Sequence, residues 1–243
     1  MQLVFSCGFL RSVIEKTESV LGAGWTTWAM SNHDNIRVVS RFGKLGQLGG
    51  DDRSLAKLLL GVLLSLRGGA CLYQGEELGL PQADVAFEDL QDPYGIEFWP
   101  EFKGRDGCRT PIPWRGDLPN AGFSKSKPWL PVSPLHQMLA VDLQEKDPNS
   151  VLHFARQFIG WRKQHPAIVY GTLALSSSAD PVLSFERVCE DERILCVFNI
   201  SNRETSTQVT EGWRTLEGHG FQSELLGAKL RLPAFSGAFC RGE

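Results

Sequence analysis

Three consecutive polar residues, Asn32, His33 and Asp34, are the part of the sequence best suited to chemistry. They end an apolar run, residues 25–30, which has the length and aromatic content of a strand buried on both faces of a parallel α/β sheet. The triplet would then lie at the carboxyl end of a strand, which is where α/β barrels place their reactive side chains. The alternative is that the triplet is a helix cap or a turn.

Two later stretches favour the first interpretation. Residues 73–80 (YQGEELGL) end the next apolar segment, and residues 104–114 (GRDGCRTPIPW) follow in a loop. Together with the triplet and Arg37, they resemble, in the same order, signature regions of the α-amylase superfamily of glycoside hydrolases, in its α-glucosidase and oligo-1,6-glucosidase branch. Residues 122–123, residues 127–132 and the tail are similar to the same branch, so the resemblance covers nearly the whole chain.

The resemblance implies a role for each member of the triplet. A carboxylate in the position of Asp34 grips hydroxyls of the bound sugar and favours its distorted, oxocarbenium-like state, which would make Asp34 a transition-state stabiliser. His33 would donate a hydrogen bond to the same sugar ring. Asn32 is expected among the substrate-binding residues.

Arg105 is the fourth expected site residue, because a guanidinium offers fixed paired donors and an arginine at this loop position reaches the sugar in this branch. Arg109 lies close enough in sequence to take that role instead. The structural alternative is that Arg105 pairs with Asp106 or Glu77 and pins the loop. Arg37 is expected to make structural pairs.

Retaining hydrolysis also needs a nucleophile and an acid, two carboxyl groups about 5–5.5 Å apart. Glu76 and Glu77 cannot be that pair, because adjacent residues of an extended chain point to opposite faces; they are expected to hold the rim. In this branch the nucleophilic Asp and the acid/base Glu precede the triplet, and nothing in residues 1–31 matches them. Glu15 and Glu18 fit the solvated face of an amphipathic helix. We therefore expect the C-terminal portion of an α-glucosidase, inactive by itself.

Periodicity predicts helices and two parallel strands, then an antiparallel region. The expected fold class is α/β: the resemblance implies the C-terminal part of a (β/α)8 TIM barrel in residues 1–168, followed by a small antiparallel β-sandwich in residues 169–243. A long ordered excursion, residues 81–149, is inserted in the first part, and its aromatic residues are expected to be packed. The predicted helices are residues 11–21, 53–66 and 151–164; the predicted strands are residues 25–30, 69–73, 172–176, 182–188, 194–200, 205–210, 229–232 and 238–241.

Composition restricts the partners. A net charge of −3 without a dense basic cluster argues against nucleic acid, and no apolar run reaches the ~20 residues of a membrane span. The six cysteines lack metal-ligand spacing, so no metal or cofactor is expected and free thiols in a cytoplasmic protein are favoured over a bond between Cys189 and Cys196. The expected partner is an oligosaccharide or disaccharide substrate, and the oligomeric state is left open.

The parent reaction implied by the resemblance is hydrolysis of terminal α-linked glucose from short oligosaccharides or sucrose-like substrates. Two alternatives stay open. A transglycosylating relative, of the sucrose isomerase or trehalose-forming type, shares the same motifs. A non-catalytic amylase-like interaction module is the other, although an intact His33 and Asp34 pair favours a working sugar site.

Overall fold

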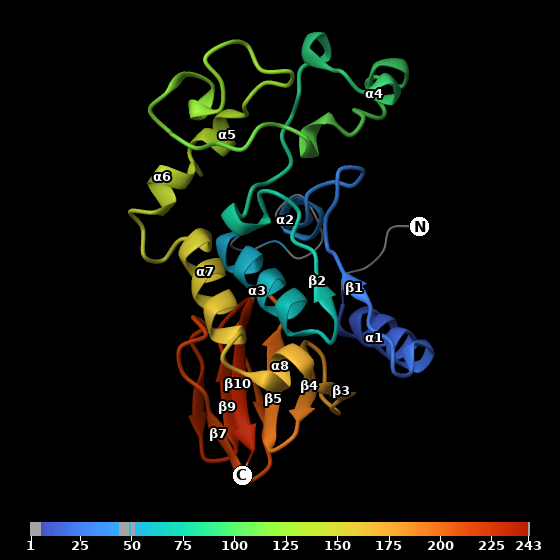
Figure 1. Ribbon diagram of the computed structural model, residues 1–243, viewed down its shortest axis with the longest axis vertical. Coiled ribbons are helices and arrows are strands. Elements are labelled where there is room, and N and C mark those ends of the chain that lie inside the picture. The colour runs from blue at the N-terminus through green and yellow to red at the C-terminus, as the bar shows by residue number, and fades with distance from the viewer. Residues whose placement is uncertain (1–5, 44–48, 50–51, 243) are drawn as a thin grey trace.

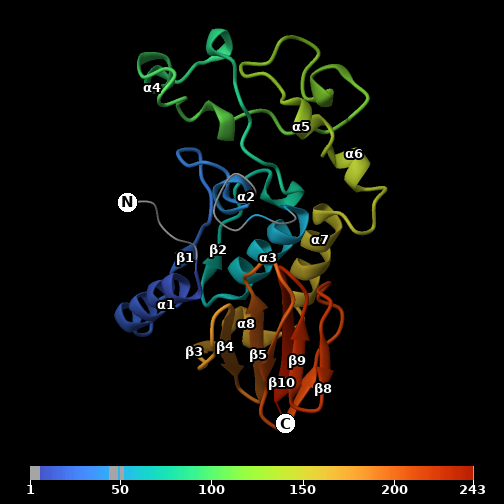
Figure 2. The same cartoon turned by 180° about the vertical axis from the view of Figure 1, so that it is seen from behind.

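The computed structural model describes residues 6–43, 49 and 52–242. Figure 1 shows three tiers along the long axis: the excursion at one end, a group of helices with two short strands in the middle, and antiparallel strands at the other end. The view from behind in Figure 2 shows the same order of tiers.

The first helix, α1 (Cys7–Leu21), begins four residues before the predicted start. Ser6 is the reason, because its hydroxyl accepts a hydrogen bond from Phe9 N at 3.2 Å and caps the helix. The helix ends at Gly22, whose positive φ of 52° suits glycine. Cys7 and Ile14 are its buried residues.

The two strands β1 (Thr27–Trp28) and β2 (Gly69–Ala70) are parallel neighbours, with α3 (Asp52–Ser65) between them in the chain. This confirms the predicted βαβ order, but residues 25–30 are not buried on both faces. Exposure alternates along the run: Trp28 and Met30 pack against the core, whereas Trp25 is 51% exposed. The reason is that, within the described residues, this sheet has two strands and is covered on one face only.

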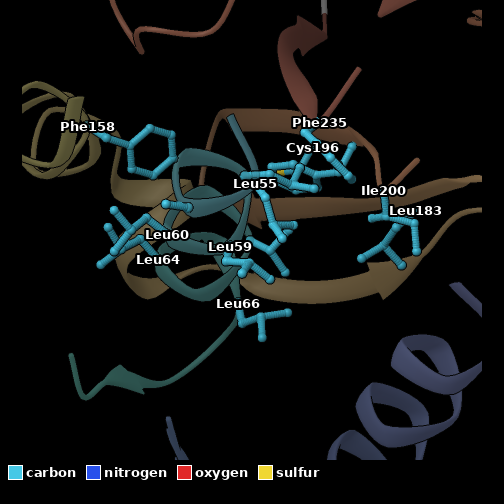
Figure 3. Packing of buried hydrophobic residues seen from close by; sticks show 14 of the residues in the cluster. Leu55, Leu59, Leu60, Leu64, Leu66, Phe158, Leu183, Cys196, Ile200 and Phe235 are labelled. Atoms are coloured by element: carbon cyan, nitrogen blue, oxygen red, sulfur yellow. The ribbon is translucent and has the colours of Figure 1, made fainter. Parts of the chain in front are cut away.

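Helix α3 is the centre of the core. Its apolar residues face every direction and are buried, as expected for a helix covered on all sides. It packs on α7 (Val151–Arg162) and on the antiparallel strands β5 (Glu192–Asn199) and β10 (Ser236–Gly242). Figure 3 shows leucines of α3 lying between Phe158 of α7 and residues of the antiparallel strands, such as Leu183 and Cys196. The parallel and antiparallel parts therefore share one hydrophobic core.

Helix α7 starts as the sequence predicted. Ser150 caps it, because its hydroxyl accepts a hydrogen bond from His153 N at 3.2 Å. The helix ends two residues before the predicted end, and Pro166 then opens a further short helix, α8 (Pro166–Tyr170). Proline suits the first turn of a helix because that turn needs no backbone donor.

The antiparallel part confirms the predicted all-β tail. One sheet has the order β3-β4-β5-β10-β7 and the other β6-β9-β8. Two strands escaped the sequence analysis because each has three residues, too few for an alternating pattern. The strands are β3 (Thr172–Leu175), β4 (Val182–Cys189), β5 (Glu192–Asn199), β6 (Thr205–Gln208), β7 (Trp213–Thr215), β8 (Glu224–Leu226), β9 (Lys229–Leu232) and β10 (Ser236–Gly242).

The excursion is ordered, as predicted, and consists of loops that connect short helices. The expectation that its aromatic residues are packed is wrong for several of them: Trp129 is 65% exposed and Phe98 53%. Its own apolar cluster is small, with Val85, Leu90 and Leu130 packed beside Trp99, so it cannot cover every ring. The short helices here and near the strand ends are α2 (Val38–Phe42), η1 (Glu76–Leu78), η2 (Phe87–Asp89), α4 (Pro93–Glu97), η3 (Asp106–Cys108), η4 (Pro119–Gly122), α5 (Pro134–Gln137) and α6 (Val141–Gln144).

All six cysteines are free. The β4–β5 register places Cys189 opposite Glu192 and Cys196 opposite Phe185, so these two cysteines do not face each other across the hairpin. Among the helices of residues 6–43 and 52–242, none combines the length and hydropathy that crossing a membrane requires.

Candidate functional site

The polar triplet forms a turn that is separated from β1 by residues 29–31. The side-chain oxygen of Asn32 accepts hydrogen bonds from Asp34 N and from Asn35 Nδ2, each at 2.9 Å. This is the turn considered as an alternative, and it leaves the next two side chains in solvent: His33 is 70% exposed and Asp34 49%. The turn therefore presents these two side chains, while the Asn32 oxygen is engaged within the turn.

Two arginines from the excursion meet Asp34. Arg105 Nη1 and Arg109 Nη2 both donate to Asp34 Oδ1, at 3.2 and 3.1 Å, across sequence separations of 71 and 75 residues. His33 Nε2 lies 3.5 Å from the other oxygen, Oδ2. The structure thus brings together His33, Asp34 and Arg105 of the predicted site, and it adds Arg109 at the same carboxylate.

Asp92 is a site residue that the sequence analysis missed. Its side chain is fully buried, and its carboxylate accepts hydrogen bonds from Nε and Nη2 of Arg105, at 2.9 and 2.7 Å. This hydrogen-bonded pair lowers the pKa of Asp92 to about 2 and raises the pKa of Arg105. The Asp-Pro step at residues 92–93 is an ordinary helix start, so nothing local marked Asp92 as a partner of Arg105.

The structural alternatives for Arg105 are not what the geometry shows. Asp106 instead accepts hydrogen bonds from the backbone N–H groups of Gln91 and Asp92, at 2.6 and 2.8 Å. Glu77 accepts from Gly75 N at 2.8 Å. Arg105 therefore pins no loop through either of them, and its partners are Asp92 and Asp34.

Arg109 ties the excursion to the triplet. Its Nε donates to the backbone carbonyl of His33 at 2.8 Å. Beside it, the Tyr73 hydroxyl donates to the carbonyl of Cys108 at 3.0 Å, which joins the end of β2 to the same loop. The excursion and both strand ends are thereby held in one fixed arrangement.

Beneath the turn, Arg37 is buried and structural, as predicted. Its Nη1 donates to the carbonyl of Gln74 at 2.7 Å, and its backbone N–H donates to Gln82 Oε1 at 3.0 Å. Burial lowers the pKa of this guanidinium, which also lies over the Tyr73 ring. Arg37 thus supports the site from below without reaching its surface.

Glu76 and Glu77 brace the turn after β2. Glu76 is buried, which raises its pKa, and it accepts a hydrogen bond from Tyr73 N at 3.2 Å. The Glu77 carboxylate accepts a hydrogen bond from the backbone N–H of Gly75 in the same turn. Both carboxyl groups therefore serve the rim, as expected.

The arrangement suits an uncharged ligand rich in hydroxyl groups. Of the two carboxylates in the Arg105 network, Asp34 is half-exposed and Asp92 is buried. Hydroxyls can donate to the first and accept from the arginines around it. Within the described part of the chain, no three His, Cys, Asp or Glu side chains are placed to hold a metal ion.

Comparison with known proteins agrees with this chemistry. The model of the α-amylase catalytic domain family matches residues 3–171. A probable alpha-glucosidase of Rhizobium meliloti (strain 1021) is 48% identical over 219 residues, 90% of this chain and 39% of its own. An oligo-1,6-glucosidase of Parageobacillus thermoglucosidasius is 34% identical, over 82% of this chain and 38% of its own. The chain thus spans less than half the length of these relatives.

Solved structures give the same result. The α-glucosyl transfer enzyme XgtA matches 99% of this chain, and 44% of its own, with a TM-score of 0.92 and 43% identity. The trehalulose synthase MutB from Pseudomonas mesoacidophila MX-45 matches with a TM-score of 0.83 and 28% identity, over 99% of this chain and 47% of its own. Variants of MutB were solved with glucose and with the substrate sucrose. The matches confirm the predicted fold class.

Proposed function

Because the chain belongs to the α-amylase family of glycoside hydrolases, we propose that it forms the C-terminal part of a retaining α-glucosidase. The enzyme would release terminal α-linked glucose from short oligosaccharides or sucrose-like disaccharides. One observation carries this proposal: the exposed carboxylate of Asp34 is held at a strand end between Arg105, Arg109 and His33.

In the proposed site, each group has a task in sugar binding. Asp34 accepts hydrogen bonds from two sugar hydroxyls, and these bonds strengthen as the ring flattens toward its oxocarbenium-like state. Arg105 donates from the side, and His33 donates from Nε2. Arg109 keeps the triplet in place through the His33 carbonyl. The side-chain oxygen of Asn32 is occupied by hydrogen bonds within the turn, so Asn32 would contact the substrate through its other atoms.

We also propose that this chain alone does not hydrolyse α-glucosides. Cleavage needs a nucleophilic carboxylate and an acid on opposite sides of the bond. Here the one other carboxylate in the Arg105 network, Asp92, is buried and bound to Arg105. Loss of covalent and acid catalysis costs several powers of ten in rate.

The experiment compares two proteins with a chromogenic α-glucoside. One is this chain; the other is a chimaera in which the catalytic signatures of the Rhizobium meliloti relative are fused ahead of it. We expect turnover by the chimaera and none above background by the chain. Comparable turnover by the two would contradict the proposed inactivity, and a folded chimaera without α-glucosidase activity would contradict the proposed function.

A second candidate function is transfer of the glucosyl group to another sugar. The observation that favours it is the match to XgtA, an α-glucosyl transfer enzyme, at a TM-score of 0.92. The two outcomes differ in whether water or a sugar hydroxyl attacks the glucosyl enzyme. Incubating the chimaera with sucrose or maltose separates them, since hydrolysis yields free glucose and transfer yields new glucosides.

For the compartment we propose the cytoplasm. All six cysteines are free, and free thiols suit a reducing environment. Fractionation of cells that express the protein checks this, and recovery outside the cytoplasm would contradict it.

A further inference from the structure

The Arg105 guanidinium is shared between two carboxylates of very different exposure. Its Nε and Nη2 edge faces Asp92, which is fully buried, and its Nη1 faces Asp34, which is 49% exposed. The guanidinium also lies over the ring of Tyr94, with Arg105 Cζ 5.2 Å from the centroid of that ring. Paired donors on a planar group give directional contacts, so the two-bond pair with Asp92 fixes where Nη1 points.

We propose that Asp92 is a positioning residue of the sugar site. It holds Arg105 so that a single nitrogen reaches Asp34, and it prevents Arg105 from turning its paired edge onto Asp34. A carboxylate closed in a two-bond pair with an arginine has fewer free acceptor positions for sugar hydroxyls. This inference rests on the proposed function, because it assigns Asp92 a part in the same site.

The chain around Asp92 is built for this pair. The backbone N–H of Arg105 donates to Asp92 Oδ2 at 2.7 Å, and Asp106 fixes the Asp92 backbone from the other side. Gly104 has a φ of 76°, and a Cβ there would lie 2.9 Å from Asp92 Oδ2. Glycine is thus required where the loop passes the carboxylate. Each residue of the Gly-Arg-Asp sequence at 104–106 thus contributes to the pair: Gly104 leaves room for the Asp92 carboxylate, Arg105 binds it, and Asp106 holds its backbone.

Without Asp92, the position of Arg105 is undetermined. An arginine side chain loses substantial rotamer entropy when it is fixed, and an exposed ion pair repays little of that loss. Asp34 is the remaining carboxylate partner of Arg105, and it is half-exposed. In an Asp92→Asn variant, we expect the Arg105 side chain to alternate between two states: one in which it extends into solvent and one in which its paired edge forms two hydrogen bonds to Asp34.

The first measurement needs no ligand. In the nitrogen-15 NMR spectrum of the full chain, the Arg105 Nε–H signal is identified by its loss in Arg105→Met. It should exchange with water at least about tenfold more slowly than that of exposed Arg156, and Asp92→Asn should abolish this protection. The matched control is Asp84→Asn, which removes an exposed carboxylate paired with Lys103 in the same excursion. Equal exchange of the two wild-type arginines would overturn the proposal even if Asp92→Asn failed to fold.

The second measurement tests the action through Arg105. Affinity for methyl α-glucoside is measured by NMR titration in wild type, in Asp92→Asn, in Arg105→Met and in the variant that carries both of these changes. In the wild-type background we expect Asp92→Asn to weaken binding about tenfold. In the Arg105→Met background we expect the same change to alter affinity less than about twofold. Asp84→Asn should leave affinity unchanged.

The outcomes separate the two proposals. An equal loss of affinity in both backgrounds would show a general structural role for Asp92 and overturn the inference. If the wild-type chain did not bind the glucoside, the proposed function would fail at this site, and the exchange of Arg105 would still decide whether Asp92 positions it.

Discussion

At the scale of single residues, Asp34 is an exposed carboxylate with two arginines on one of its oxygens. Each contact is that of a partly exposed ion pair, which contributes little net free energy because solvent screens it. Sugar hydroxyls can therefore compete for Asp34 at small cost. Asp92, in contrast, is fully buried and holds Arg105 through two side-chain hydrogen bonds, so we expect this pair to persist when a ligand binds.

The Asp34→Asn change tests the role of this carboxylate in turnover. In the chimaera, kcat for a chromogenic α-glucoside should fall at least about a hundredfold while KM changes little, because the lost contacts strengthen in the transition state. Asp84→Asn should alter neither constant. Steady-state kinetics measures both, and an unchanged kcat would remove Asp34 from the mechanism.

At the scale of elements, the C-terminus of α3 is capped from outside the helix. The last turn of α3 has no basic residue of its own. Buried Arg187 of β4 donates to the carbonyls of Ser65, Gly171 and Thr172, and Arg162 donates to that of Leu64 at 2.8 Å. Cations at a helix C-terminus satisfy its orphan carbonyls and its dipole. Arg187, on β4, thereby joins the antiparallel part to α3, and Arg162 adds a contact to α3 from α7.

Replacing Arg187 by Met should therefore cost more than a surface arginine would. Three carbonyls lose their donor, and the bonds to two of them, those of Ser65 and Gly171, are buried, so we expect the free energy of unfolding to fall by about 3 kcal/mol. Arg156→Met, which breaks an exposed pair with Glu145, should cost less than about 1 kcal/mol. Urea denaturation compares the two variants, and equal losses would refute the capping role.

At the scale of the whole molecule, two histidines are buried in neutral form. His136 is buried within the excursion, on α5, with Nε2 2.7 Å from the carbonyl of Pro81. His219 lies among aromatic rings of the shared core and accepts a hydrogen bond from Phe221 N at 3.1 Å. Burial lowers the pKa of each to about 4.

Stability should therefore fall as the pH drops from about 6.5 to about 4. In that window the unfolded chain binds protons at both histidines and the folded chain does not, so each contributes a loss of roughly 1 kcal/mol at pH 5.5. Replacing both by Gln should flatten the dependence, whereas replacing partly exposed His153 should not. Urea denaturation at pH 7 and 5.5 provides the check, and the proposal fails if the double variant keeps the wild-type slope.

Much of the organisation was determined by the sequence alone. The period of apolar residues predicted α3, α7 and six of the antiparallel strands, because each depends on its own local pattern. The order of the triplet, residues 73–80 and residues 104–114 indicated the family and hence the fold class, both of which are confirmed. The division at residues 168 and 169, and the roles of the site residues, stay predictions.

The tertiary structure decided which side chains meet. Arg105 and Arg109 reach Asp34 across 71 and 75 residues, and no local pattern encodes such a contact. The partner of Arg105 could have been any nearby acid, and the fold selected Asp92 because Gly104 and Asp106 bring its buried carboxylate beside the guanidinium. Burial was likewise decided by packing: Trp25, Trp28 and Met30 are all apolar residues of the run 25–30, but Trp28 and Met30 pack against the core and Trp25 is exposed.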